Sequence, residues 1–182
     1  MDERTDEALA HLVQQGDIDV FGVLMERYEA KLTRYLTKFL IRGEDAKDIL
    51  QEIFIKAYTN INTFDPKRSF SPWIYRIAHN EAVNTIRKRK RDMIIPLDLD
   101  LLFPQPVAKE TADKETQDKE LAQLIEKGLD KLDPKYREAL VLYFFEEMDY
   151  KMIADVLQIP TSTVGVRIKR AKELLKKQLP NI

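Results

Sequence analysis

Residues 150–175, YKMIADVLQIPTSTVGVRIKRAKELL, predict two helices joined by a short turn. Asp149 can cap the first helix and Thr161 can cap the second. Apolar residues recur at helical spacing in both, so each helix has one face to bury: Ile153, Ala154 and Leu157 in the first, and Val164, Ile168, Ala171 and Leu175 in the second. A helix, a short turn and a helix with a basic exposed side are typical of a helix-turn-helix.

The exposed side of the second helix suits nucleic acid. Ser162 and Thr163 lie at its N-terminal end, where small polar side chains of a recognition helix approach base edges. Arg167 and Arg170 suit phosphates or a guanine edge. For this pattern alone, the alternative is an ordinary helical hairpin with a solvated basic face.

Most of the remaining chain also predicts helices. Apolar residues repeat three and four apart over residues 17–40, 44–58 and 71–91, with Ser71 and Pro72 as the cap and first position of the third helix. Asp133 and Pro134 start another helix in the same way. The chain has only 5 Gly and 8 Pro, which argues against turn-rich β folds, so we predict an all-α fold.

Residues 92–116 have a different character, with three prolines among mixed apolar and acidic residues. We therefore predict two small helical domains, residues 1–91 and 117–182, joined by a flexible acidic linker. Residues 65–91 hold eight basic and two acidic side chains, and residues 159–182 hold six basic and one acidic. Nine acidic and four basic residues lie between them over 97–130, so the charge pattern predicts two separate anion-binding surfaces.

Several classes of protein are disfavoured by composition. Cysteine is absent, and His11 and His79 are far apart, so we predict no disulfide, metal site or cofactor. No catalytic triad or phosphate-binding loop is found, and we predict that the chain is not an enzyme. The N-terminus is acidic and the longest apolar run, residues 139–145, is too short to span a membrane, so we expect a cytoplasmic protein without membrane insertion.

Residues 58–91 mix aromatic with basic side chains, a combination that suits unstacked single-stranded bases. The alternative places Phe70 and Trp73 in the core and leaves the basic run 87–91 as a solvated helix end. Upstream, Asp48, Glu52 and Lys56 lie four apart on one helical face. By physical chemistry alone they form a solvated face with weak ion pairs.

Three segments, in order, resemble the extracytoplasmic-function sigma factors of bacterial RNA polymerase. DAKDILQEIFIKAY, residues 45–58, resembles the helix that binds the clamp of the β′ subunit. FDPKRSFSPWIYRIAHNEAVNTIRKRKR, residues 64–91, resembles the segment that opens and reads the minus-ten element, and YREALVLYFFEEMDYKMIADVLQIPTSTVGVRIKRAKELL, residues 136–175, resembles the minus-thirty-five reader. The resemblance covers nearly the whole chain and implies an alternative sigma factor that promotes promoter melting and transcription initiation.

The resemblance also implies residue roles and partners. Polymerase binding falls on Asp48, Gln51 and Glu52, and a flipped-out base on the loop 64–71. Contacts with promoter DNA fall on Lys56, Phe64, Arg76, Asn80, Arg87, Lys88, Ser162, Thr163, Arg167 and Arg170, whereas Trp73, Ile77 and Ala78 are structural. The implied partners are core polymerase, through its β′ clamp and β flap, promoter DNA and an anti-sigma factor, with no small-molecule substrate.

The chain departs from the family pattern within the helix-turn-helix. Gly165 and Val166 replace a common Lys and Ser, which removes two expected DNA contacts, and Gly165 also weakens the helix. Gln158 replaces the usual glycine before the recognition turn, and Asn84 replaces a common aspartate. The rival hypothesis is a conventional helix-turn-helix regulator that binds duplex DNA without polymerase.

Overall fold

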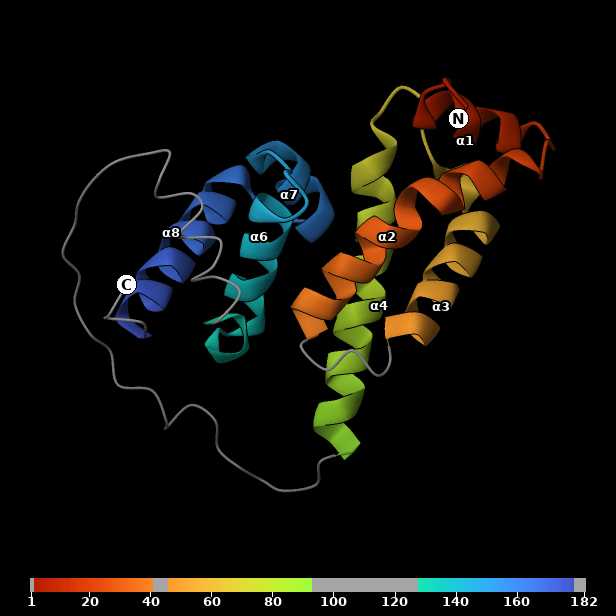
Figure 1. Cartoon of the computed structure of the whole chain (residues 1–182). Coiled ribbons are helices and arrows are strands. Elements are labelled where there is room, and N and C mark those ends of the chain that lie inside the picture. Colours follow the sequence, from red (N-terminus) through yellow and green to blue (C-terminus); the bar gives the residue numbers. More distant parts are fainter. Residues whose placement is uncertain (1, 41–45, 93–127, 179–182) are drawn as a thin grey trace.

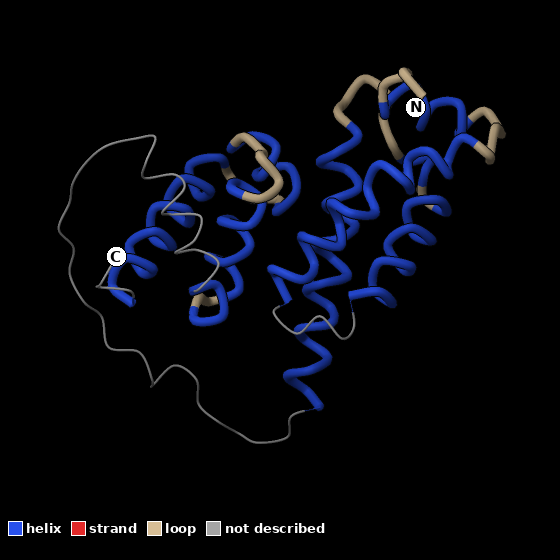
Figure 2. Tube along the Cα trace, viewed as in Figure 1, coloured by secondary structure: helices blue, strands red, loops and turns tan. Residues whose placement is uncertain are grey.

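The computed structural model describes residues 2–40, 46–92 and 128–178, and these residues form helices and no strand (Figures 1 and 2). The α-helices are α1 (Asp6–Gln14), α2 (Val20–Leu40), α3 (Ala46–Thr59), α4 (Phe70–Asp92), α6 (Pro134–Phe144), α7 (Tyr150–Leu157) and α8 (Thr161–Gln178). Short 3-10 helices span Ile61–Thr63 (η2) and Leu129–Lys131 (η4). The predicted all-α class is confirmed, while the predicted linker and the boundary at residue 117 fall almost wholly outside the described residues.

Capping side chains set several helix starts where the sequence predicts them. The Asp133 carboxylate accepts a hydrogen bond from the Lys135 backbone N–H at 2.9 Å, and Pro134 opens α6. Asp149 accepts from the Met152 backbone N–H at 2.7 Å and starts α7. These bonds satisfy backbone donors that a helix N-terminus leaves unpaired. Within the described segments, no helix has the length and apolar content needed to cross a membrane.

Helices α1 to α4 form the N-terminal half, residues 2–92, around a core rich in aromatic rings. Phe70 is fully buried, and its ring centroid lies 5.4 Å from that of Tyr28, 5.2 Å from Phe64 and 5.3 Å from Trp73. Edge-to-face and tilted rings at these separations stabilise one another beyond simple burial. The cluster fixes the point where the chain leaves η2 and enters α4.

Helices α6, α7 and α8 form the C-terminal half, residues 128–178, in the predicted helix-turn-helix arrangement. Ile153 and Leu157 of α7 are buried, as are the four predicted apolar residues of α8, and Ala154 is half-buried. Gln158 ends α7 in the left-handed region, with φ 54° and ψ 46°, and its side-chain amide donates to the Asp155 carbonyl at 2.6 Å. This conformation explains why a glycine would suit the position.

The two halves lie against each other, with α4 packed on α7 and α2 packed on α6 (Figure 1). The N-terminal helix α1, which the sequence patterns above do not predict, covers the start of α4 and contacts α2. Its own start is capped by Thr5, whose hydroxyl accepts from the Ala8 backbone N–H at 3.2 Å.

Candidate nucleic-acid interface

Helix α3 presents a polar face that continues into exposed apolar side chains, Ile55 and Tyr58, toward its C-terminal end. Its buried side holds Ala46, Ile49, Leu50, Ile53, Phe54 and Ala57. Asp48, Gln51 and Glu52 are exposed on the opposite side, as expected for a surface that binds a partner. Ile55 is 56% exposed and follows Gln51 by four residues and Glu52 by three, so it shares their face. We call these four residues the α3 face.

Ile55 is a residue that the pattern analysis missed. An isoleucine in an amphipathic helix is ordinarily assigned to the core. The signal was nevertheless present, because the buried stripe of α3 is complete without Ile55, which lies on the other side.

Lys56 and Asn80, both predicted to face DNA, line one open pocket of about 240 Å³. Lys56 Nζ lies 2.9 Å from Glu81 Oε1 and 3.5 Å from Glu52 Oε1. The hydrogen bond to Glu81 raises the pKa of Lys56 above its ordinary value. Glu81, which the sequence analysis did not single out, therefore holds this cation at the mouth of the pocket.

Arg76, Asn80 and Arg87 lie on one face of α4. Their spacings of four and seven residues return to nearly the same angle on a helix, and they span about 16 Å along its axis. Asn80 and Arg87 are exposed and Arg76 is half-buried. We call these three residues the α4 strip. Lys88 is also exposed but projects from a different side of the helix.

The loop before α4 is exposed from Asp65 to Ser69, between buried anchors at Phe64 and Phe70. We correct one expectation here: the Phe64 ring is only 4% exposed and packs on Phe70 and Trp73, so it belongs to the core and is not available to stack on a base. Trp73, predicted as structural, joins the same cluster. The 65–69 loop and Arg76 line a cleft of about 700 Å³, whose other wall comes from α7 and its C-terminal turn.

The residues of α8 that were predicted to contact DNA differ in their exposure to solvent. Ser162 is exposed, whereas Thr163, Arg167 and Arg170 are half-buried, and Arg170 Nη1 lies 3.3 Å from Glu173 Oε2. A Cβ atom added at Gly165 would lie 3.5 Å from the Tyr150 ring, so this glycine faces α7. Val166 is 66% exposed and shares a face with Ser162 and Arg170, four residues to either side. This apolar residue was noted only as a departure from the family pattern.

Two buried carboxylates hold the halves together. Glu138 of α6 is 3% exposed and accepts a hydrogen bond from the Tyr35 hydroxyl at 2.5 Å, and His79 Nδ1 lies 2.6 Å from the same oxygen. Burial and the neighbouring carboxylate raise the pKa of Tyr35 well above its ordinary value. The Glu146 side chain is 1% exposed and accepts from Arg34 at 2.9 and 2.8 Å and from the Tyr75 hydroxyl.

Arg137 adds a third link between the halves. Its guanidinium donates to the Phe39 carbonyl of α2 at 3.1 Å and to the Leu132 carbonyl at 3.0 Å, and burial lowers the pKa of the side chain. Buried charged groups of this kind need their hydrogen-bond partners. If one partner is removed, the remaining group stays buried and has neither water nor another side chain to bond with. We call the contacts of Glu138, Glu146 and Arg137 the inter-half contact.

Comparisons with known proteins agree with this geometry. Sigma-70 region 2 matches residues 24–92 and Sigma-70, region 4 matches residues 122–175. ECF RNA polymerase sigma factor SigW of Bacillus subtilis (strain 168) is 36% identical over 176 residues, which cover 93% of this chain and 94% of that protein. The ECF RNA polymerase sigma-E factor of Haemophilus influenzae is 32% identical over 184 residues, covering 98% of this chain and 97% of that protein.

Solved structures with the same fold include CnrH in complex with the cytosolic domain of CnrY, with a TM-score of 0.69 and 28% identity. That match covers 96% of this chain and 97% of CnrH. The sigma factor RpoE, solved with the anti-sigma factor NepR from Bartonella quintana, has a TM-score of 0.67 at 24% identity and covers 88% of this chain and 97% of RpoE.

Proposed function

The chain belongs to the extracytoplasmic-function sigma factors of bacterial RNA polymerase, and on this premise we propose how its parts divide the work. Residues 2–92 bind core polymerase and the minus-ten element, and residues 128–178 bind the minus-thirty-five element. The observation that carries this division is the α4 strip, which lies in the helix directly after the exposed 65–69 loop and beside the Lys56 pocket.

We infer that the α3 face binds the polymerase. Its exposed apolar side chain, Ile55, lies beside the polar Gln51 and Glu52, which precede it by four and three residues, and Tyr58, 38% exposed, follows it by three. Protein interfaces commonly combine an apolar centre with a polar rim that is solvated in the free protein. Among the polymerase elements implied by the family, the β′ clamp is the partner for this face and the β flap is the partner for the C-terminal half.

The N-terminal half also reads the melted minus-ten strand in this proposal. The α4 strip follows backbone phosphates, while the 65–69 loop holds an unstacked base and Asn80 positions the strand. Extruding a base costs a few kcal/mol, which contacts in a pocket offset. Lys56 reaches a phosphate by exchanging its contact with Glu81 for one with DNA, so its contribution falls as salt rises.

Helix α8 reads the minus-thirty-five duplex from the major groove. Ser162 and Thr163 lie in its first turn, where recognition helices meet base edges. Arg167 and Arg170 supply phosphate contacts or a guanine contact further along. The protein carries out no bond-making step of its own in this scheme, and we propose that it acts in the cytoplasm.

An anti-sigma factor is the remaining partner that we propose. CnrH, which resembles this chain over nearly its whole length, was solved with the cytosolic domain of CnrY. The exposed α3 face and the α4 strip are surfaces that such a partner would cover, because sigma activity depends on both.

A promoter-binding experiment separates this proposal from a conventional duplex-binding regulator. Labelled promoter fragments are incubated with the protein alone, with core polymerase alone, and with both. We expect a specific shifted complex only when both are present. A tight, specific complex of the protein alone, unchanged by core polymerase, would sink the proposal in favour of the conventional regulator.

A further inference from the structure

We propose that α1 positions the base-reading loop, through Gln14 at one end of the loop and Glu7 at the other. This inference rests on the proposed function, because that function makes the 65–69 loop, between the buried Phe64 and Phe70, the place where an unstacked base binds. Helix α1 lies outside residues 24–92, the part of the N-terminal half that matches Sigma-70 region 2. Nothing in that match assigns it a role.

Gln14 holds the chain where it enters the loop. Its side-chain amide Nε2 donates to the Ile61 carbonyl and to the Phe64 carbonyl, each at 2.8 Å. Ile61 begins η2 and Phe64 follows its end, so one half-buried amide bridges both ends of this short helix. The Ile61 carbonyl also accepts from the Phe64 backbone N–H at 3.0 Å, so Gln14 is a second donor to it and ties it to the Phe64 carbonyl.

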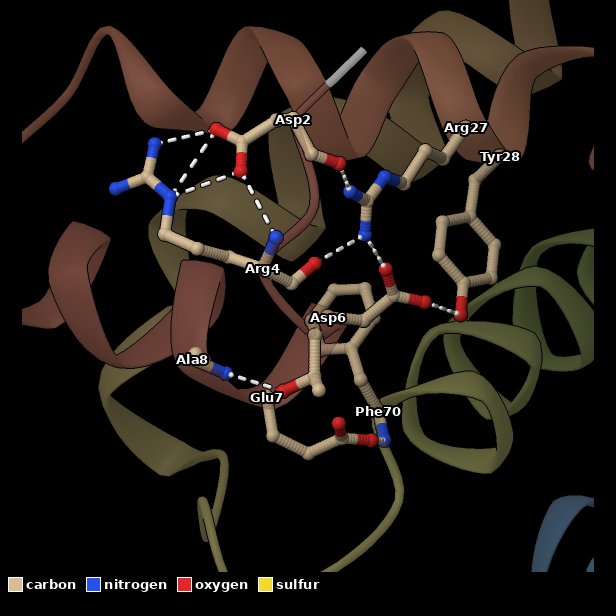
Figure 3. Close-up of polar contacts among 9 residues, drawn as sticks. Asp2, Arg4, Asp6, Glu7, Ala8, Arg27, Tyr28 and Phe70 are labelled. Atoms are coloured by element: carbon tan, nitrogen blue, oxygen red, sulfur yellow. Dashed lines mark hydrogen bonds and ion pairs between the residues drawn. The ribbon is translucent and has the colours of Figure 1, made fainter.

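Glu7 holds the chain where it leaves the loop. Its carboxylate Oε1 accepts a hydrogen bond from the Phe70 backbone N–H at 3.0 Å, and Phe70 is the first residue of α4 (Figure 3). A carboxylate at a helix N-terminus satisfies an unpaired donor and interacts favourably with the helix dipole. Glu7 therefore caps α4 from another helix, and α4 begins at Phe70, two residues before the predicted first position, Pro72.

Helix α1 is itself held firmly enough to act as a support. Arg27 of α2 donates to the Asp6 carboxylate at 2.5 Å and to the Arg4 carbonyl at 2.9 Å, and the Tyr28 hydroxyl donates to the other Asp6 oxygen at 2.7 Å (Figure 3). Leu9 and Ala10 are fully buried in the core. Gln14 and Glu7 therefore both extend from a helix that is anchored to α2 by the Arg27–Asp6 ion pair and by apolar packing.

The loop between the Gln14 and Glu7 contacts packs little against the core. Asp65 to Ser69 are exposed, and the hydrogen bonds recorded within this stretch are local, from the backbone N–H groups of Lys67 and Arg68 to Asp65. Its conformation is thus set mainly at its ends. A loop already held in its binding conformation loses less entropy when it captures a base. Gln14 and Glu7 are, in this account, positioning residues that need not touch DNA.

Hydrogen exchange tests whether α1 holds the loop. The variants are Gln14→Met and Glu7→Met, which keep side-chain size but remove the donor or the acceptor. Glu7→Gln keeps an acceptor oxygen. Gln15→Met is the control, because the Gln15 side chain, directly after α1, contacts His11 and not the loop. We expect backbone amides of residues 64–70 to exchange about tenfold faster in both removal variants, near wild-type exchange in Glu7→Gln, and no change in Gln15→Met. Unchanged exchange in both removal variants would overturn the proposal.

A second readout tests the consequence for promoter reading. Holoenzymes made with core polymerase are incubated with a pool of single-stranded DNA that carries six randomised positions, and the retained strands are sequenced. The removal variants should lower the enrichment of the wild-type motif by about fivefold, with affinity for core polymerase unchanged within twofold. Loss of core affinity together with enrichment would mean that α1 is merely structural.

The two readouts separate failure of this inference from failure of the proposed function. A wild-type holoenzyme that enriches no motif contradicts base reading by this half of the protein. The exchange result still decides whether Gln14 and Glu7 hold the loop.

Discussion

Val166 is an exposed valine on a helix that otherwise presents polar and basic residues. In the major groove an apolar side chain recognises the methyl group of thymine. We therefore predict that promoters with thymine opposite Val166 lose about threefold in affinity when that thymine is replaced by uracil, which lacks the methyl group.

The Val166 prediction has an internal control. In Val166→Ser, thymine and uracil promoters should bind the holoenzyme equally, as measured by fluorescence anisotropy. If the wild-type holoenzyme shows no loss at any thymine of the minus-thirty-five element, Val166 does not read this methyl group.

Gly165 lies within α8, where a glycine lowers helix stability, and its backbone does not adopt a conformation that requires glycine. An added Cβ would be in ordinary contact with the Tyr150 ring at 3.5 Å. Glycine within a helix is about 1 kcal/mol less favourable than alanine. We predict that Gly165→Ala raises the free energy of unfolding by roughly that amount, measured by urea denaturation.

Gly22→Ala is the matched variant for this measurement, because nothing lies within 4 Å of a Cβ atom added to that helical glycine. Both variants should gain stability if helix propensity dominates. A gain for Gly22→Ala with a loss for Gly165→Ala would show that the Tyr150 ring cannot accommodate the methyl group.

At the scale of elements, the α3 face is the surface that we propose binds core polymerase, and Ile55 is its apolar residue. Ile55 is 56% exposed, so much of its apolar surface remains to be buried on binding. We predict that Ile55→Ala weakens binding to core polymerase by about tenfold, in line with the loss of a few buried methyl and methylene groups. Ile18→Ala, at a residue that is 59% exposed just before α2, should bind core polymerase like the wild type. Equal affinities for the two variants would remove α3 from the polymerase interface.

Local chemistry in the sequence predicts some elements well and others poorly. Asp133 and Asp149 cap their helices as predicted, because a cap depends on residues within one turn. The start of α4 lies two residues before the predicted first position, Pro72, and its first N–H bonds to Glu7, 63 residues away. No local pattern carries that information. Helix α1, by contrast, has local signals in the sequence that the prediction did not use: Thr5 caps it, its first turn is acidic, and the buried Leu9 and Val13 are four residues apart.

In the candidate site, too, features set by local sequence were predicted and features set by long-range contacts were not. Exposure of Asp48, Asn80 and Arg87 follows from helical periodicity, which the sequence displays. The burial of Phe64 depends instead on a cluster with Phe70 and Trp73, so its ring faces the core in this structure. The pairing of Lys56 with Glu81 joins two helices and was likewise invisible in the sequence.

At the scale of the whole molecule, the two halves are packed together, which we call the closed arrangement. This arrangement is incompatible with binding both promoter elements at once. The elements are named for positions about 25 base pairs apart, which corresponds to about 85 Å of duplex at ~3.4 Å per base pair. In this structure α4 packs directly on α7, and the 65–69 loop shares a cleft with it. On the proposed division of the two promoter elements between the halves, the halves therefore separate when polymerase and promoter are bound.

We predict that Glu138→Ala favours separation of the halves. The change leaves the Tyr35 hydroxyl buried without its acceptor, which disfavours the closed arrangement by about 1–3 kcal/mol. Because the chain has no cysteine, dyes can be attached to cysteines introduced at the exposed Lys47 and Lys176. Energy transfer between the dyes should fall in Glu138→Ala and should fall further with core polymerase.

Glu29→Ala, at an exposed residue of α2, is the control and should leave energy transfer at the wild-type value. High energy transfer that persists in wild-type holoenzyme on a promoter would show that the halves stay together during initiation.

The most direct test of the central claim is run-off transcription with purified bacterial core polymerase on a library of promoter fragments, with and without this protein. A sigma factor should produce transcripts that require both components, from a subset of fragments that share two spaced sequence elements. No protein-dependent transcript from any fragment, with core polymerase shown to be active with another sigma factor, would contradict the account.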